Sequence, residues 1–93
     1  MIIDFKCSET EKIFSGVSSR KFSINLQSVA RRKLRMLNNA IDLQDLRIPP
    51  ANRLEKLEGS RKGQHGIRIN KQWRICFIWN NGQVHQVEIV DYH

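Results

Sequence analysis

The chain has 93 residues, of which 40% are hydrophobic and 27% are charged, a composition typical of one folded globular domain. Sixteen lysines and arginines against nine aspartates and glutamates give a formal net charge of +7, which favours a polyanionic partner such as nucleic acid. No apolar run approaches the roughly 20 residues of a membrane span, and the N-terminus lacks the plan of a signal peptide. We therefore expect one domain over residues 1–93, located in the cytoplasm and without a membrane partner.

The N-terminal half predicts a short strand followed by two helices. Ile2, Ile3 and Phe5 surround Asp4 in a strand-like pattern. Ser8 and Glu11 have the spacing of a capping box, so a short helix should begin there and end near Gly16. A longer helix is expected next, because apolar residues recur there at helical spacing: Leu26, Val29, Ala30, Leu34, Leu37 and Ile41.

The C-terminal half predicts an antiparallel β-meander. Pro49-Pro50 cannot continue a helix and favours an extended Ile48, so this segment should link the two halves. The apolar period then becomes two over residues 67–79, and Asn80-Asn81-Gly82 is typical of a hairpin turn before a returning strand over residues 84–92. Helices followed by consecutive strands define an α+β fold with helices on one face of the sheet.

The sequence contains no glycine-rich phosphate loop, no zinc-protease motif and no nucleophile elbow. Cys7 and Cys76 form neither a CxxC pair nor part of a metal cluster, so we expect reduced thiols, no metal and no cofactor. A nuclease with these residues would depend on side-chain acids, bases and cations. RNA permits this, because its own 2′-hydroxyl is the nucleophile.

Arg74 and His93 could supply the cation and the acid of such a reaction. If the two C-terminal strands pair across Asn81-Gly82, the start of one strand lies beside the end of the other. Arg74 would then neighbour Asp91, Tyr92 and His93, although the register is not predicted. A surface role for Arg74 stays open, and Trp73 and Trp79 are expected to pack in the core.

The stretch NRLEKLEGSRKGQHGIRINKQWRICFIW and the terminal VEIVDYH resemble the HigB-type toxins of the RelE/ParE superfamily. The resemblance covers nearly the whole chain. Its specific parts are the Leu-x-Gly-x-Arg-x-Gly segment at residues 57–63, the Trp73-Arg74 pair and the terminal Asp-Tyr-His.

The resemblance implies a toxin of a type II toxin–antitoxin system that enters the ribosome and cleaves mRNA in the A site without a metal. It also implies a HigA-like helix-turn-helix antitoxin that blocks the toxin and represses their operon, so that operator DNA is contacted indirectly through the antitoxin. The basic residues expected to hold mRNA and the ribosome are Arg31, Arg32, Arg35, Arg53, Arg61, Lys62, Arg68 and Lys71.

By the same resemblance, Arg74 stabilises the transition state, and the terminal triplet Asp91, Tyr92 and His93 is a functional group in which His93 is the acid. Some HigB toxins carry a histidine and a lysine where this chain has Glu55 and Glu58. We expect Glu55 to act as the base. Glu58 is expected to weaken activity or to change the substrate fit, because a carboxylate repels phosphate. Alternatively, both glutamates are exposed strand or loop residues.

Two other functions are compatible with parts of the sequence. The superfamily also contains ParE-like proteins, which inhibit DNA gyrase without cutting RNA, and a basic accessory protein would explain the charge alone. Arg74 together with the terminal triplet favours the enzyme, because a pure inhibitor has no chemical need for them.

Overall fold

The computed structural model describes residues 1–91. Two α-helices, α1 (Ser8–Phe14) and α2 (Ile24–Asn39), precede two short 3-10 helices, η1 (Leu43–Arg47) and η2 (Pro50–Asn52). The strands follow as β1 (Glu55–Lys56), β2 (His65–Arg68), β3 (Trp73–Asn80) and β4 (Gln83–Asp91), with the 3-10 helix η3 (Gly59–Arg61) between β1 and β2. The predicted α+β fold is confirmed.

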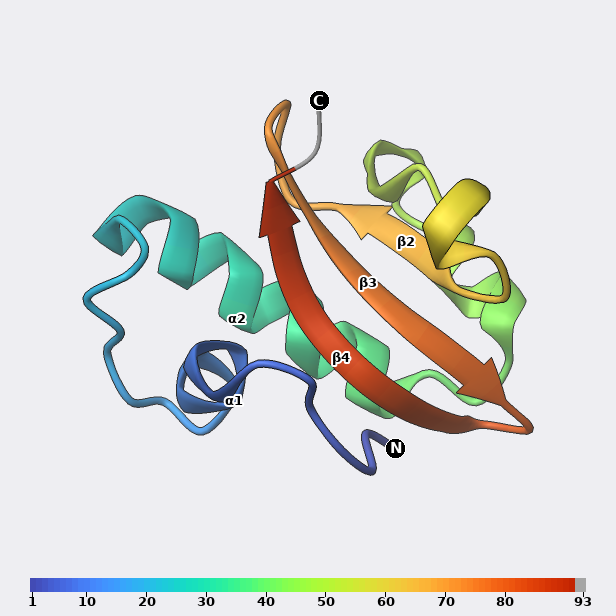
Figure 1. Cartoon of the computed structure of the whole chain (residues 1–93), viewed down its shortest axis with the longest axis horizontal. Coiled ribbons are helices and arrows are strands. Elements are labelled where there is room, and N and C mark those ends of the chain that lie inside the picture. Colours follow the sequence, from blue (N-terminus) through green and yellow to red (C-terminus); the bar gives the residue numbers. More distant parts are fainter. Residues whose placement is uncertain (92–93) are drawn as a thin grey trace.

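The four strands form one antiparallel sheet in the order β1-β2-β3-β4, which is the predicted meander with one short extra strand. The turn between β3 and β4 contains Asn81 and Gly82, both with positive φ, as a tight hairpin turn requires. Figure 1 shows α2 behind the sheet, while the segment that contains η3, in yellow, lies in front of it.

The hydrophobic core lies between the helices and the sheet. From α2 it takes residues on one helical face, such as Ala30, Leu34 and Leu37, each fully buried. Alternate residues of β3, Ile75 and Phe77, meet them from the sheet. Trp73 and Trp79 pack against this core, as predicted.

The ends of the N-terminal elements differ from three expectations. Ile41 is 87% exposed, because α2 ends at Asn39 and the chain turns away from the core. The prediction of a capping box at Ser8 is wrong, because Cys7 is the N-cap of α1 and no side chain caps that helix. Ile2 and Phe5 form isolated parallel bridges with Val84 and Val87 of β4, in place of a continuous strand.

The segment between α2 and the sheet is ordered by a buried polar group. Asn52, fully buried in η2, donates to the carbonyl of Leu46 in η1 and accepts from Lys33 of α2. Ile48 is extended before Pro49, as the sequence predicts. Within residues 1–91, no helix has the length and hydrophobicity needed to cross a membrane.

Candidate active site

The sheet face opposite the helices carries charged side chains from three neighbouring strands. Arg68 of β2 lies directly across from Arg74 of β3, and Glu55 of β1 lies across from Gly66 of β2. Because side chains alternate along a strand, Glu55, Arg68 and Arg74 share the face that the helices leave open. We call these three residues the Glu55–Arg68–Arg74 cluster.

Arg74 is the most buried charge of this cluster, with only 7% of its surface exposed. Its Nη1 lies 2.8 Å from Oε1 of Glu55, whose side chain is 40% exposed. Gly66, which lies between the two strands, contributes no side chain to this face. A Cβ at Gly66 would meet the Leu57 side chain at 3.4 Å, so this part of the sheet is closely packed. The ion pair therefore fixes the guanidinium at one place on the face.

Arg68 adds a second cation beside Arg74. Its Nε is buried and has no hydrogen-bond partner among the residues that the structure describes. Two like charges directly opposite each other destabilise a β-ladder, and a buried polar atom without a partner adds to that penalty. Both penalties would be relieved by an anion between the two arginines.

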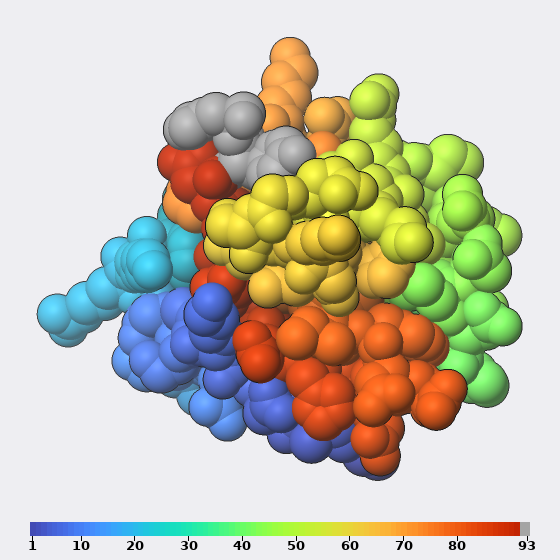
Figure 2. Space-filling view, turned by 45° about the vertical axis from the view of Figure 1, so that its right-hand side comes forward, coloured from blue at the N-terminus to red at the C-terminus, as the bar shows by residue number. Residues whose placement is uncertain are grey.

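The segment of residues 57–64 covers the neighbouring part of the open face, beside β4 (Figure 2). Arg61 holds it there through an ion pair with Glu88 of β4, with Nη1 and Oε1 2.7 Å apart. This contact raises the pKa of Arg61. Under the segment, burial raises the pKa of the Cys76 thiol, so Cys76 is protonated at neutral pH and has a packing role.

The end of β4 lies beside the start of β3, as the predicted hairpin requires. Trp73 pairs with Asp91, and Arg74 pairs with Val90. Asp91 accepts a hydrogen bond from Nε2 of Gln72 at 3.1 Å, so the structure brings its backbone close to Arg74 while its carboxylate contacts the β2–β3 turn. Tyr92 and His93, which the sequence assigns to the site, lie outside the described residues.

The predicted RNA-binding residues do not form one surface. Arg32 and Arg35 are exposed residues of α2, the helix that Figure 1 shows behind the sheet. Arg31 donates from Nε to the carbonyl of Ile13 at 2.8 Å and thereby joins α2 to α1. The others lie along the sheet side: Arg53, Lys62 and Lys71 are exposed, and Arg61 and Arg68 are partly buried.

The structure places Glu58 in a position that the sequence analysis left open, and it gives a role to Glu88, which the sequence analysis did not consider. Glu58 is an exposed loop residue directly before η3 and lies outside the Glu55–Arg68–Arg74 cluster. Glu88 was not singled out by the sequence, yet it holds Arg61 over the sheet and lies 3.9 Å from Lys6. Its position opposite Cys76 could have been found only from the strand register.

Solved structures of low sequence identity share this fold. The chain superposes with a TM-score of 0.62 on a chain of the heterotetrameric YoeB–YefM toxin–antitoxin complex from Staphylococcus aureus, at 12% identity, covering 100% of this chain and 98% of that chain. YafQ from Escherichia coli gives a TM-score of 0.60 at 16% identity, covering 98% and 91%. The fold is therefore the α+β fold of the RelE-like toxins.

Sequence comparison narrows this class to one family. The family model of the HigB-like toxins, described as RelE-like toxins of type II toxin–antitoxin systems, matches residues 4–93. Toxin HigB-1 of Vibrio cholerae serotype O1 is 40% identical over 83 residues, covering 88% of this chain and 87% of the relative. Endoribonuclease HigB of Proteus vulgaris is 30% identical over 96 residues, covering both chains completely. The chain belongs to the HigB-like toxin family.

Proposed function

We propose that this protein is the toxin of a toxin–antitoxin pair and acts as a ribosome-dependent endoribonuclease that cuts mRNA in the A site. The family and the relative from Proteus vulgaris, which is named an endoribonuclease, support cleavage of RNA. The observation that carries the proposal is the Glu55–Arg68–Arg74 cluster, in which a carboxylate and two cations meet on an open sheet face.

The cluster contains groups for two parts of an RNA cleavage reaction. Glu55 takes the proton from the 2′-hydroxyl, whose oxygen then attacks the adjacent phosphorus. Arg74, helped by Arg68, stabilises the negative charge that grows on the phosphoryl oxygens. The bond from phosphorus to the 5′ oxygen breaks, leaving a 2′,3′-cyclic phosphate on one fragment and a 5′-hydroxyl on the other.

The departing 5′ oxygen must receive a proton, and we assign this role to His93. An unperturbed imidazole has a pKa near 6.5, which suits proton transfer near neutral pH. Asp91 and Tyr92 are proposed to position the substrate and the histidine. The pairing of Trp73 with Asp91 supports the assignment, because it brings the end of β4 beside Arg74.

The partners follow from the same proposal. Ribosomal RNA and mRNA would contact exposed cations on two sides of the molecule, including Arg32 and Arg35 on α2 and Lys62 and Lys71 beside the sheet. A HigA-like antitoxin would inhibit the toxin and would provide its indirect link to operator DNA. The solved YoeB–YefM complex, which pairs a toxin of the same fold with its antitoxin, supports a partner of this kind. The cytoplasm is the compartment in which these partners occur.

The test is primer extension on ribosomes that carry a defined mRNA, beside the same mRNA free in solution. The parent protein should cut within the A-site codon of the bound message and leave free mRNA intact. Arg74→Ala should reduce the single-turnover rate by about 100- to 1000-fold, the usual effect of removing one group that stabilises a developing oxyanion. His93→Gln should also lose most of the rate.

Lys12→Ala is the matched control, because it removes one exposed positive charge from α1. It should cut like the parent. An intact message with folded parent protein would contradict the proposal and would make inhibition of DNA gyrase the next function to assay. Equal cutting by Arg74→Ala and the parent would contradict the role of Arg74.

A further inference from the structure

A hollow of about 390 Å³ lies beside the active site, between η1 and the edge strand β1. Ligand sites in proteins usually have volumes of roughly 300–1,000 Å³ and combine an apolar lining with a few polar groups. Here the apolar part is Leu43 and Leu54, and the polar part includes Gln44, Arg47 and Lys56. We call this hollow the β1 hollow.

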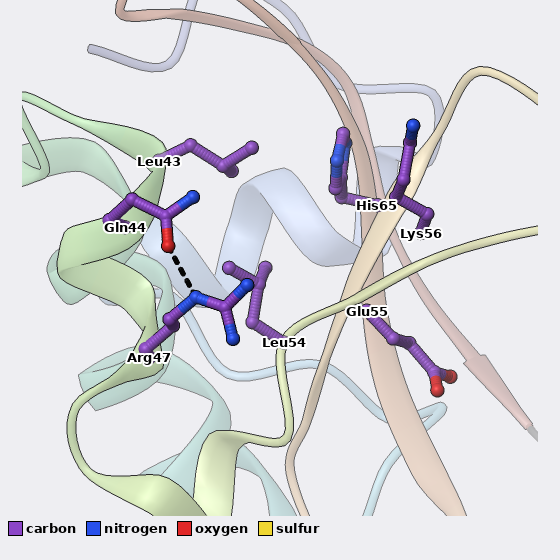
Figure 3. A pocket seen from close by; sticks show the side chains of 7 residues that line it. All are labelled: Leu43, Gln44, Arg47, Leu54, Glu55, Lys56 and His65. Atoms are coloured by element: carbon purple, nitrogen blue, oxygen red, sulfur yellow. Dashed lines mark hydrogen bonds between the residues drawn. The ribbon is translucent and has the colours of Figure 1, made fainter.

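The lining of the β1 hollow favours an anionic ligand. Arg47 and Lys56 are exposed cations on opposite walls, and Arg47 donates from Nε to the side chain of Gln44. Among the lining residues that the structure describes, Glu55 alone is acidic. Figure 3 shows its carboxylate pointing away from Lys56 and His65, and this carboxylate pairs with Arg74 on the open face. The positive charges therefore face the hollow without an opposing carboxylate.

His65 gives the β1 hollow an aromatic wall. Its ring stacks on Phe77, with centroids 6.2 Å apart and planes 24° apart, so the imidazole is held in a fixed orientation. Burial lowers the pKa of His65, and the charge of Lys56 lowers it further, so the ring is neutral at pH 7. A neutral ring beside two leucines is a suitable surface for a planar base.

Glu55 connects the β1 hollow to the active site. It lines the hollow, and its carboxylate reaches inward over Gly66 to Arg74 on the open face. Lys56 and His65, which pair with each other, face the helix side of the same edge. Because β1 is the edge strand and has two residues, an RNA strand can pass from the open face over this edge. A second hollow of about 320 Å³ shares Lys56 and His65 and adds Lys62 and Glu58, so the edge carries two lysines and one carboxylate there.

We propose that the β1 hollow is a subsite for one nucleotide of the same RNA strand that is cut, adjacent to the scissile phosphate. The base lies against His65, Leu43 and Leu54, and a backbone phosphate contacts Lys56 and Arg47. This inference rests on the proposed function, because the strand that enters the subsite is the substrate of the active site. The subsite would position the message and would influence which nucleotide is accepted there.

Binding is tested directly with Arg74→Ala protein labelled with ¹⁵N and a 2′-O-methyl trinucleotide, which has no free 2′-hydroxyl and cannot be cut. The amide signals of Leu43, Lys56 and His65 and the side-chain amide of Gln44 should shift. An absence of shifts at these groups would overturn the subsite. Shifts caused by an acidic peptide of equal charge but not by the trinucleotide would also overturn it, and would assign the hollow to a protein partner.

Cleavage provides a second test that separates the subsite from the chemistry. Lys56→Gln should raise the toxin concentration that gives half-maximal single-turnover cleavage, with a plateau rate close to that of the parent. It should also lower by about one the slope of the logarithm of that concentration against the logarithm of the salt concentration, as loss of one phosphate contact does. Lys12→Gln, the matched control on α1, should change neither quantity.

The stacking role is tested by two substitutions at one position. His65→Ala should raise the toxin concentration that gives half-maximal cleavage by about tenfold, in line with loss of one base-stacking contact. His65→Phe should restore it, because a phenyl ring keeps the flat surface. Equal losses in both variants would overturn the stacking role.

Failure of the subsite and failure of the proposed function give different results. A parent protein that cuts, with Lys56→Gln and His65→Ala variants that behave like it, overturns the subsite and leaves the nuclease intact. A parent protein that does not cut, with trinucleotide shifts confined to the β1 hollow, overturns the nuclease and keeps an RNA-binding site.

Discussion

The two faces of the sheet bury their residues in different ways, and the comparison separates stability from chemistry. Ile75 and Arg74 are neighbours on β3, with 0% and 7% of their surfaces exposed. Ile75 packs among hydrocarbon side chains between the sheet and α2, whereas Arg74 is buried next to Glu55 and across from a second arginine. Burial of apolar surface stabilises a fold, but burial of charge contributes little or opposes folding. The helix-side face therefore holds the molecule together, and the open face keeps the charges that we propose to act in RNA cleavage.

The largest expected effect is a difference in unfolding free energy between variants of Ile75 and Arg74. Ile75→Ala should lower the free energy of unfolding by about 3 kcal/mol, because it leaves a cavity in the core. Arg74→Ala should change it by less than about 1 kcal/mol, since its partner Glu55 is partly solvated. Urea denaturation of both variants measures the difference. Similar losses in the two variants would mean that the open face is as important for stability as the core.

Glu55→Gln tests whether the carboxylate on the open face does chemistry. The substitution keeps the size of the side chain and removes its ability to accept a proton, so the single-turnover cleavage rate should fall about 100-fold. Circular dichroism should show an unchanged fold. A rate within threefold of the parent would show that Glu55 is not the base and that its main role is to orient Arg74.

Arg68→Gln should lower activity without lowering stability. It removes one of two like charges that face each other across β2 and β3, so the free energy of unfolding should stay equal or rise by about 0.5 kcal/mol. Cleavage should fall about tenfold, because one cation is lost near the phosphate. A less stable variant would indicate that Arg68 has a structural role that outweighs the repulsion.

The smallest effect concerns His65, which lies at the helix-side edge of the sheet, and its contribution to the pH dependence of the free energy of unfolding. Burial lowers the pKa of His65 in the folded chain below its unfolded value of about 6.5. Between these two values the unfolded chain binds more protons, so the contribution of His65 is complete above about pH 6.5 and is lost as the pH falls. The stability of His65→Phe should therefore decrease less between pH 7.5 and pH 5.5. Urea denaturation at both pH values tests this, and parallel decreases in the two proteins would contradict it.

The sequence predicted the hairpin but could not predict its register. Counting outward from the turn, Ile78 pairs with His85, and the same count would place Cys76 opposite Val87 and Arg74 opposite Ile89. The structure pairs Cys76 with Glu88 and Arg74 with Val90, because the register shifts between Cys76 and Ile78. The shift coincides with Gln86, which has a φ of 53°. Glutamine gives no sequence signal for this conformation, so the faces of residues 87–91 could not be assigned beforehand.

The charge pattern was also insufficient to separate exposed from buried basic residues. Four of the five residues 31–35 are cationic, and the charge pattern alone does not distinguish Lys33 from Arg31, Arg32 and Arg35, which are predicted to bind RNA. Lys33 lies instead on the inner side of α2, where it donates to Asn52 and burial lowers its pKa. Its partner is an uncharged residue 19 positions further along the chain. Such a contact depends on how η2 folds back on α2, which helical periodicity does not describe.

The contacts of Asp4 have a consequence for the order in which the protein is completed during synthesis. Asp4 accepts a hydrogen bond from the backbone of Gln86 at 2.7 Å and lies 2.9 Å from Nδ1 of His85, two contacts that lower its pKa. The residues that hold the bulge in β4 are therefore 81 and 82 positions apart. Contacts of such high sequence separation form late, and here they cannot form until nearly the whole chain has left the exit tunnel. A nascent chain whose residues 85 and 86 are still inside the ribosome lacks the strand register on which the open face depends, so a protein that is proposed to attack ribosomes cannot acquire its final geometry before these residues emerge.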